Sequence, residues 1–295
     1  MYSNNMTATS IGKEKRMQRL LHEGKCVFVP LDDSLISGPI QGLLNLKDKI
    51  ADICEAQPSG ILGFSGTLRI VNEVSTDTPF ILNLTASSTR SEHTNKEVVS
   101  SVKRAVTMGA DAVAVHINVS SKYEGKMLKS LGTVSEQCDE YGVPLMVLAY
   151  PRKEICNNGV WVSEENYYKL KHIDSDQYTN LVAHCTRLAY EMGANIIKTQ
   201  YTGSKKSFER VINAAQGIPV VIAGGDMLED IELLSMCKDA IDSGAAGICF
   251  GRNVFNRNNS KSIIVALKKI VINGESVNNA IEYMKQLERG HLNEH

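Results

Sequence analysis

The chain has 295 residues, 43% of them hydrophobic and 22% charged, and its formal net charge of −1 gives no electrostatic sign of nucleic-acid binding. No apolar stretch approaches the roughly 18 residues of a membrane span, and the polar first residues do not resemble a signal peptide. The seven cysteines are scattered without disulfide or metal-ligand spacing. Together these features lead us to expect a cytoplasmic protein that binds no metal, nucleic acid or membrane.

Short, continuously apolar runs recur along the chain, as is typical of parallel strands buried on both faces. The expected strands are Cys26–Leu31, Gly60–Phe64, Pro79–Leu84, Ala112–Ile117, Pro144–Ala149, Asn195–Thr199, Pro219–Ala223 and Gly247–Phe250. Around them, apolar residues spaced three and four apart predict helices that turn one face to a core. The expected helices are Gly12–Leu21, Leu46–Ile53, Val98–Ala105, Met127–Cys138, Leu181–Met192, Phe208–Ala215, Leu228–Ala240, Ser260–Ile272 and Val277–Leu287.

Several helical patterns end in glycine just before the next strand, as at Gly109, Gly193 and Gly244, where we expect a left-handed C-cap. Eight strands alternating with helices over this length favour a single α/β domain, a (β/α)8 TIM barrel, over an open doubly wound sheet. We expect the barrel at residues 12–289, between a flexible N-terminus (1–11) and a short C-terminal tail (290–295).

One interval, residues 152–176 after the fifth expected strand, is unusually long for a loop of a compact barrel. It is polar and aromatic, with Trp161, Tyr167 and Tyr168. A loop of that length is uncommon unless it serves as a lid or carries its own short helix. The sequence therefore predicts one of these two at this point.

Polar side chains stand where several expected strands end, and in a barrel these carboxyl ends form the active site. Lys198 closes the sixth strand, where a buried strand would normally place another aliphatic residue. Burial depresses the pKa of a lysine and leaves a nucleophilic amine, which Schiff-base chemistry requires. An exposed lysine on the barrel rim is the alternative interpretation of this position.

Further groups at strand ends are candidates for moving protons or polarising a carbonyl. Tyr150 ends the neighbouring fifth strand, about 4.8 Å away in a sheet, so its phenol is a candidate acid–base group. Asp32 and Asp33 follow the first strand, although aspartates also begin turns and cap helices. His116, at the end of the fourth strand, either polarises a substrate carbonyl or is a core histidine.

Glycines follow the seventh and eighth strands, in the loops that form the recurrent phosphate site of this fold. Gly224 and Gly225 follow the seventh strand, and Gly251 and Arg252 follow the eighth. Glycine lets backbone amides approach a phosphate, and arginine adds a charge-assisted hydrogen bond. The pattern predicts a phosphate site, with a tight turn as the alternative explanation for either pair alone.

Several segments together resemble the class I aldolases related to archaeal-type fructose-bisphosphate aldolase and deoxyribose-phosphate aldolase. They are Val29–Asp32 with Gly38-Pro39, Leu148–Arg152, Lys198–Gly203, Ala223–Gly225, and Gly244–Gly247 followed by Gly251–Asn253. The resemblance extends over about residues 12–285, in the family's order. It implies a barrel in which Lys198 forms the Schiff base, Tyr150 is the acid–base group and Asp32 is the aspartate of the first strand.

Within this family the chain looks closer to the 2-amino-3,7-dideoxy-D-threo-hept-6-ulosonate synthases than to the fructose-bisphosphate aldolases. The aldolases tend to carry tryptophan where this chain has Leu148, and the segment His116–Val119 is also similar to the synthases. The chain departs from its relatives at Asp33-Ser34, where they usually read His-Gly. A group that titrates near neutrality is thereby replaced by a carboxylate, which can share a proton with Asp32 if both point inward.

We therefore predict a class I aldolase in which Lys198 forms a Schiff base with a phosphorylated ketose or keto donor and an aldehyde is the second substrate. We expect no cofactor and a homo-oligomer. Alternatives with the same chemistry are fructose-bisphosphate aldolase and a synthase that joins aspartate semialdehyde to dihydroxyacetone phosphate. A flavin-binding oxidoreductase barrel, with its phosphate site also after strands seven and eight, and a catalytically silent scaffold are alternatives from other classes.

Overall fold

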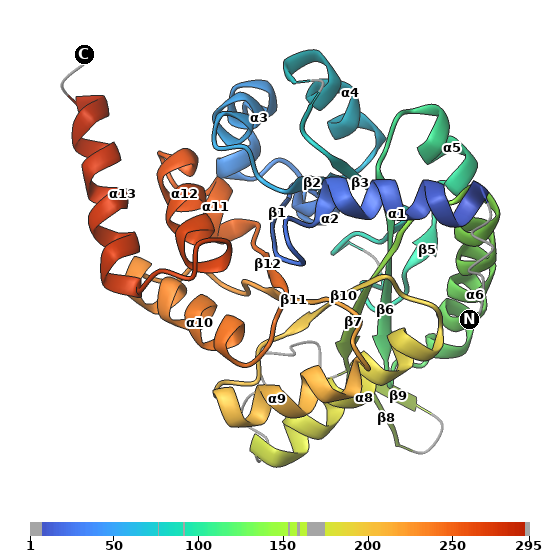
Figure 1. Ribbon diagram of the computed structural model, residues 1–295. Helices are drawn as coiled ribbons and strands as arrows, with labels where there is room; N and C mark the ends of the chain where they lie inside the picture. Colours follow the sequence, from blue (N-terminus) through green and yellow to red (C-terminus); the bar gives the residue numbers. More distant parts are fainter. Residues whose placement is uncertain are drawn as a thin grey trace, which may run out of the picture.

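The computed structural model describes residues 8–75, 77–90, 92–152, 154–157, 160–163 and 175–292. Within these residues, eight parallel strands close into a barrel surrounded by helices (Figure 1), which confirms the expected fold. Around the barrel the strands follow the order β1-β12-β11-β10-β7-β6-β3-β2. Their bounds are β1 Cys26–Pro30, β2 Gly60–Gly63, β3 Phe80–Asn83, β6 Ala112–Val119, β7 Leu145–Pro151, β10 Ile196–Gln200, β11 Val220–Ala223 and β12 Gly247–Cys249.

The helices pack outside the barrel and confirm most of the expected periodic segments. The longer ones are α1 Ala8–Leu20, α3 Leu46–Glu55, α4 Ser65–Val74, α5 Val102–Thr107, α6 Glu124–Tyr141, α8 Ser175–Glu191, α9 Lys205–Ala214, α10 Asp230–Asp242, α12 Ser260–Val271 and α13 Val277–Leu292. Three short ones lie near the mouth of the barrel, α2 Asp33–Ser37, the 3-10 helix η1 Gln41–Leu43 and α11 Arg252–Phe255. The glycines expected to cap helices, Gly109, Gly193 and Gly244, all have positive φ.

One expected helix begins later than its apolar spacing suggested. Val98 was expected in a helix but lies in the two-residue strand β5 (Glu97–Val98), which pairs antiparallel with β4 (Thr85–Ala86). The helix α5 begins at Val102 because the hydroxyl of Ser101 accepts a hydrogen bond from the backbone N–H of Arg104. The short sheet β4–β5 follows β3 and carries the chain back over the mouth of the barrel.

The core consists of two apolar clusters, one inside the barrel and one between the strands and the helices. The interior cluster takes alternate residues from the strands and contains Cys26, Phe28, Leu62, Ile81, Ala112, Ala114, Met146, Leu148, Tyr150, Ile196, Val221 and Cys249. The outer cluster takes the intervening strand residues together with the buried faces of the helices. Because strand side chains alternate, a residue two positions beyond an interior one also points inward.

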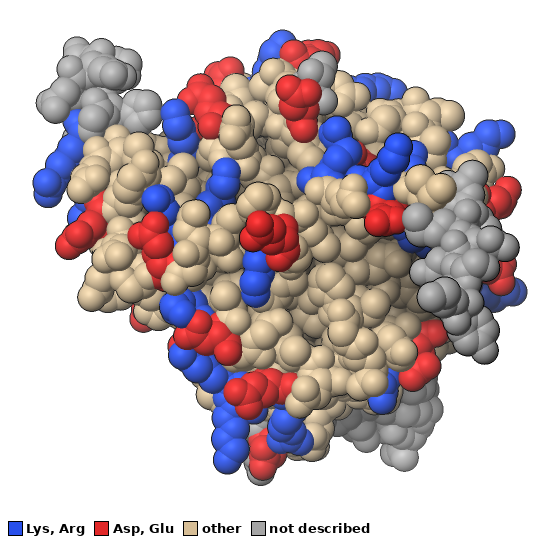
Figure 2. All heavy atoms as spheres, viewed as in Figure 1, with Lys and Arg blue, Asp and Glu red and all other residues tan. Residues whose placement is uncertain are grey.

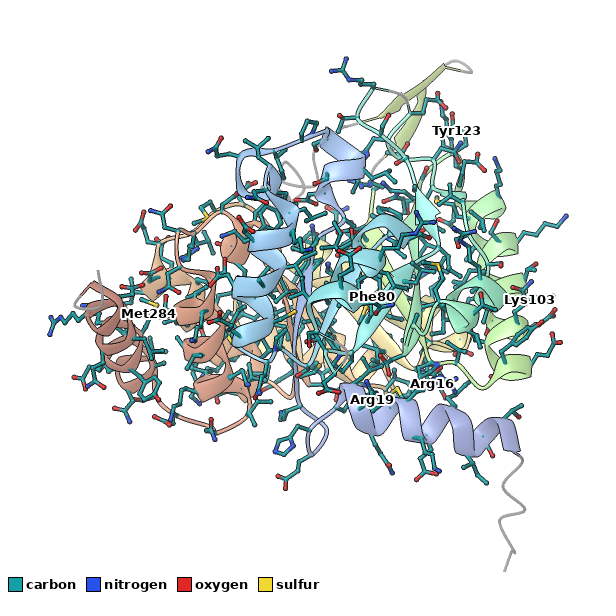
Figure 3. All side chains as sticks on the ribbon, turned by 90° about the horizontal axis from the view of Figure 1, so that it is seen from above. Arg16, Arg19, Phe80, Lys103, Tyr123 and Met284 are labelled. Atoms are coloured by element: carbon teal, nitrogen blue, oxygen red, sulfur yellow. The ribbon has the colours of Figure 1, made fainter. Side chains whose placement is uncertain are left out.

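Helix α1 covers the amino-terminal end of the barrel. Leu20 is fully buried within the interior cluster, and Arg19 pairs with Asp111, which precedes β6, at 2.6 Å. Arg16 donates to the carbonyl of Gly142, which precedes β7, at 3.0 Å. Figure 3 shows both arginines on this helix beneath the strands. The opposite, carboxyl-terminal end of the barrel is therefore the end left for chemistry.

The long interval after β7 contains an antiparallel hairpin, β8 (Glu154–Asn157) with β9 (Val160–Ser163), and Trp161 lies in β9. Tyr167 and Tyr168 lie outside the described residues, so the lid or helix remains a prediction. On the face seen in Figure 2, basic and acidic side chains are intermingled. None of the described helices combines the length and apolar character that crossing a membrane requires.

Candidate active site

Lys198 lies inside the mouth of the barrel. On β10 it is in register with Leu148 of β7 on one side and Val221 of β11 on the other. It follows the interior residue Ile196 by two positions, so its side chain points inward, and only 7% of the residue is exposed. The structure thus excludes the exposed rim lysine that the sequence left as an alternative.

Tyr150 lies one step nearer the mouth on the adjacent strand. It follows Leu148 by two positions on β7, belongs to the same interior cluster and is 5% exposed. Its ring meets the ring of His116 edge-on, with the centroids 5.0 Å apart. The phenol and the Lys198 amine therefore share one face of two neighbouring strands, as the sequence predicted.

Asp32 reaches the same interior from the end of β1. It occupies the N-cap position of α2, but its side chain makes no capping hydrogen bond. Its carboxylate instead accepts a hydrogen bond of 3.0 Å from the Nδ2 of Asn83 at the end of β3, and the residue is 8% exposed. A cap does not account for Asp32, which leaves its carboxylate to act at the mouth.

The pKa of Lys198 lies above its ordinary value, contrary to the expectation from burial. Burial does lower this pKa, but Cys249, Tyr150 and Asp32 together raise it by more, and the amine donates a hydrogen bond to the thiol of Cys249. Burial in turn raises the pKa of that thiol, so at neutral pH it stays protonated and Asp32 provides the negative charge. Resting Lys198 is therefore an ammonium, and an ammonium must lose a proton before it can act as a nucleophile.

Asp33 lies between Asp32 and the loop after β12. Its Oδ2 is 3.8 Å from the Nε of Arg252. Burial and then the charge of Asp32 raise the pKa of Asp33, while Arg252, Lys198 and Lys96 act in the opposite direction. The raised pKa follows from burial beside a second carboxylate, and the sharing of a proton between the two stays a prediction.

The loops after β11 and β12 lie together, as a shared phosphate site requires, although close packing explains part of their glycine content. A Cβ at Gly224 would come within 3.0 Å of the Phe250 ring, and one at Gly251 within 3.1 Å of the carbonyl oxygen of Pro30. Gly225 differs: its φ is +68°, and a Cβ there would meet nothing within 4 Å. The backbone at Gly225 is therefore the most open part of the expected phosphate site.

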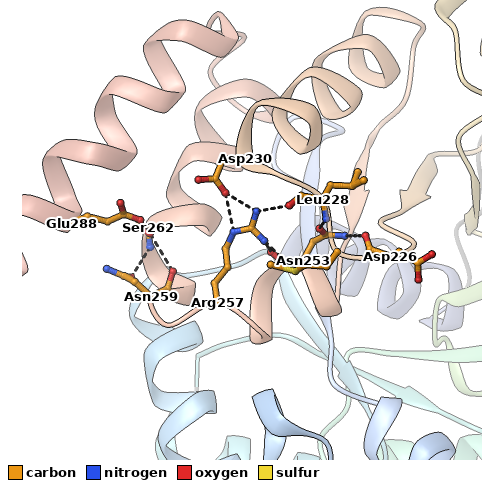
Figure 4. A network of polar contacts seen from close by, with 9 residues as sticks. Asp226, Leu228, Asp230, Asn253, Arg257, Asn259, Ser262 and Glu288 are labelled. Atoms are coloured by element: carbon orange, nitrogen blue, oxygen red, sulfur yellow. Dashed lines mark hydrogen bonds and ion pairs between the residues drawn. The ribbon is translucent and has the colours of Figure 1, made fainter.

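The side chains of Asn253 and Arg257 tie these two loops together (Figure 4). The fully buried Asn253 donates to the carbonyls of Gly224 and Asp226 and accepts from the backbone N–H of Leu228, at 3.2, 2.8 and 2.8 Å. Arg252 donates to Asp226 at 2.8 Å and keeps 40% of its side chain exposed. The carboxylates of Asp226 and Asp33 therefore account for at least part of why an arginine follows Gly251.

The sequence reasoning missed a second group of buried polar residues at the mouth, on the side of β3, β6 and β7. We call Lys96 and Arg152 the cationic pair; they are 3% and 4% exposed. Arg152 donates through Nε to the Oδ1 of Asn118 at 2.7 Å, and that oxygen also lies 3.2 Å from the Nε2 of His116. Burial and then the cationic pair lower the pKa of His116 well below its ordinary value, so at neutral pH this histidine is uncharged.

Comparison with known proteins accounts for this arrangement. The model of the DeoC/LacD family aldolases matches residues 26–257, which include the three candidate residues Lys198, Tyr150 and Asp32. The chain belongs to this family. It is an aldolase of the Schiff-base class, as the resemblance implied.

Two relatives of this DeoC/LacD aldolase are synthases. The 2-amino-3,7-dideoxy-D-threo-hept-6-ulosonate synthase 1 of Archaeoglobus fulgidus is 35% identical over 92% of this chain and 96% of the relative. The 2-amino-4,5-dihydroxy-6-oxo-7-(phosphonooxy)heptanoate synthase of Streptomyces griseus is 36% identical over 81% of this chain and 83% of the relative. Among solved structures, an archaeal fructose-1,6-bisphosphate aldolase, whose catalytic lysine is covalently bound to a carbinolamine intermediate, matches with a TM-score of 0.74 and 25% identity, covering 88% of this chain and 99% of that one.

Proposed function

We propose that Lys198 is the lysine that forms the Schiff base, and that this aldolase joins a phosphorylated keto donor to an aldehyde. The observation that carries the proposal is the position of Lys198, whose buried amine shares the mouth of the barrel with Tyr150 and Asp32. Of the lysines that the structure describes, Lys198 is the one that lies on a strand of the barrel. The phenol of Tyr150 lies one step nearer the mouth on the neighbouring strand.

The reaction begins with removal of a proton from the Lys198 ammonium by Asp32, the carboxylate that raises its pKa. The free amine adds to the donor ketone, and protonation of the resulting hydroxyl lets water leave and an iminium form. Tyr150 is placed to supply and recover that proton. The iminium withdraws electrons from the carbon that forms the new bond, so this route requires neither a metal nor an organic cofactor.

The substrate class follows from the relatives' names and from the loops after β11 and β12. Both relatives are synthases, and one is named for a product with a phosphonooxy group beside a ketone. A donor phosphate at Gly224, Gly225, Gly251 and Arg252 puts the ketone near Lys198, because these loops follow the next two strands after β10 in the barrel. Cleavage of fructose 1,6-bisphosphate is the second candidate, because the archaeal aldolase shares the fold at 25% identity. We also propose that the enzyme is cytoplasmic and forms a homo-oligomer.

Incubation with dihydroxyacetone phosphate and borohydride tests the Schiff base. We expect one reduced adduct, on the peptide that contains Lys198, and no adduct or turnover in Lys198→Ala. Lys103→Ala, which removes an exposed lysine of α5 (Figure 3), is the matched control and should leave the adduct unchanged. An adduct on another lysine, or substantial turnover in Lys198→Ala, contradicts the proposal. A panel of aldehydes then separates synthase from fructose-bisphosphate aldolase activity.

A further inference from the structure

The cationic pair lies on the opposite side of Lys198 from the expected phosphate loops. Starting from Lys198 on β10, the barrel order leads in one direction to β11 and β12, whose loops contain Gly225 and Arg252. In the other direction it leads to β7, which Arg152 follows directly, and then to β6 and β3. Lys96 directly precedes β5, which pairs with β4 just beyond β3. Lys198 therefore lies between Arg252 on one side and the cationic pair on the other.

Lys96 is buried, and in the part of the chain that the structure describes no carboxylate lies within ion-pair distance of its ammonium. Its Nζ donates to the hydroxyl of Ser87 at 2.6 Å, and among the described residues its side chain makes no ion pair. A hydroxyl is a neutral acceptor, so this hydrogen bond does not neutralise the ammonium. Buried lysines are ordinarily paired, because a charge removed from water costs several kcal/mol unless an opposite charge offsets it.

The surroundings of the pair are electrostatically suited to an anion. Burial and then the charge of Arg152 lower the pKa of Lys96 to about 8, while Asp32 and Asp33 act in the opposite direction. Burial and the same two cations lower the pKa of His93 to about 4, so this neighbour adds no charge at neutral pH. An anion placed between Lys96 and Arg152 would relieve their repulsion and give the Lys96 ammonium an opposite charge.

We propose that Lys96 and Arg152 bind the terminal anionic group, a carboxylate or a phosphate, of the aldehyde acceptor. The inference rests on the proposed function, in which the donor phosphate lies at the loops after β11 and β12 and the donor carbon reacts at Lys198. The acceptor must then approach from the β7–β6–β3 side, beside Tyr150, and its far end extends toward the cationic pair. An aldehyde with an anionic end is preferred over a neutral one for this reason.

The test compares acceptors that differ in charge, with dihydroxyacetone phosphate as donor. Wild-type enzyme is assayed with 4-oxobutanoate (carboxylate), glyceraldehyde 3-phosphate (phosphate) and uncharged glyceraldehyde. In Lys96→Met, kcat/KM for the anionic acceptor should fall roughly 10- to 100-fold, because one charged hydrogen bond is lost. Lys96→Arg keeps the charge and should recover much of that loss, and glyceraldehyde should respond little. The anionic aldehyde with the larger dependence on Lys96 identifies the group that binds.

Two controls separate this inference from the proposed Schiff base. The adduct trapped with dihydroxyacetone phosphate alone should form as fast in Lys96→Met as in wild type, whereas a wild-type enzyme without this adduct would refute the role of Lys198 instead. In that case, calorimetric titration of 4-oxobutanoate into both proteins still tests the cationic pair. Lys103→Met, which removes an exposed lysine, controls for net charge. Equal losses on charged and neutral aldehydes, or no loss on either, would overturn the inference.

The acidity of Lys96 gives a further check on the same assay. Because its pKa is about 8, the ammonium is present below that pH and is lost above it, so the preference for an anionic acceptor should decline as pH rises through 8. Arg152 stays charged throughout, and among the described residues Asp32, Asp33, His93 and His116 are the other titratable groups that interact with Lys96. Lys96→Arg should retain the preference at high pH. A decline that persists in Lys96→Arg would assign it to another group and count against the inference.

Discussion

The protonation state of Lys198 depends on side chains from three other strands. Cys249 of β12 accepts a hydrogen bond from the amine, Tyr150 belongs to β7, and Asp32 follows β1. Because the thiol is neutral at neutral pH, the carboxylate of Asp32 is the neighbour that opposes the effect of burial. In the proposed mechanism Asp32 accepts the proton that Lys198 must release, and until then its charge holds the resting amine in the unreactive ammonium form.

This balance predicts the effect of Asp32→Asn. Burial lowers the pKa of Lys198, and without the carboxylate less negative charge opposes this effect. The pKa of Lys198 should therefore fall, and more of the amine should be neutral at a given pH. The pH profile of adduct formation with dihydroxyacetone phosphate should move to lower pH, with about tenfold more neutral amine for each pH unit by which the pKa falls. Turnover should nevertheless decrease, since the same carboxylate moves protons.

The measurement is the initial rate of borohydride-trapped adduct across the pH range. Asp33→Asn is the matched control, because Asp33 lies beside Arg252 and contributes less to the charge around Lys198. Its profile should move less than that of Asp32→Asn. A profile that stays in place in Asp32→Asn would mean that Asp32 does not set the acidity of the lysine.

At the level of single residues, sequence predicted the groups that stand at strand ends and missed those placed by long-range contacts. Lys198, Tyr150 and Asp32 follow from strand register, because parallel strands bring their carboxyl ends together. Lys96 lies in a loop with no apolar periodicity, and only the pairing of β4 with β5 brings it to the mouth. The hydrogen bond from Lys198 to Cys249 likewise spans two strands and depends on closure of the barrel.

At the level of elements, the loops after β11 and β12 form one unit held together by Asn253. This residue bonds to three backbone groups of the β11 loop, while Arg252, next to it, reaches toward Asp226 and Asp33 with part of its side chain in water. We therefore expect Asn253 to support the loops and Arg252, next to it, to contact the anion. The division can be tested with one substitution at each.

Arg252→Ala should weaken the binding of phosphorylated donors by roughly 1 to 2 kcal/mol. This is less than the loss of a buried charged hydrogen bond would cost, because the Arg252 side chain is 40% exposed. A non-phosphorylated ketone should respond little, and the melting temperature should change little. Asn253→Ala should instead destabilise the fold by about 1 to 3 kcal/mol and slow turnover of every donor, because it removes three hydrogen bonds that hold the loop after β11. Kinetics with hydroxyacetone and its phosphate, together with thermal melting, measure both. If Arg252→Ala lowers kcat/KM equally for both donors, Arg252 supports the loop and the glycines alone form the phosphate site.

The elements that sequence failed to predict are mostly short. The helices α2 and α11 span five and four residues, too few for a 3.6-residue period to be recognised. The ten-residue helix α4 starts with Ser65, Gly66 and Thr67, which read as a loop. The long strands and helices were predictable because each repeats its apolar pattern over its full length.

At the level of the whole molecule, stability and chemistry reside at opposite ends of the barrel. Helix α1 closes the amino-terminal end with Leu20, while the proposed catalytic groups lie at the carboxyl-terminal end. Active-site residues in this fold come from the loops at the carboxyl end, so the amino end is left to support the fold. A cavity made at the amino end should therefore cost stability without altering the site.

Leu20→Ala tests this separation. Leu20 is fully buried, and truncating a buried leucine costs about 2 to 5 kcal/mol, which lowers the melting temperature by roughly 4 to 20 °C at this chain length. Ile11→Ala on the same helix removes an exposed side chain (38%) and should change the melting temperature little. Well below the melting temperature, both variants should form the Lys198 adduct at the wild-type rate, because neither residue contacts the mouth. Slower adduct formation in folded Leu20→Ala would show that the packing of α1 is transmitted through the interior cluster to Lys198, and the two ends would then not be independent.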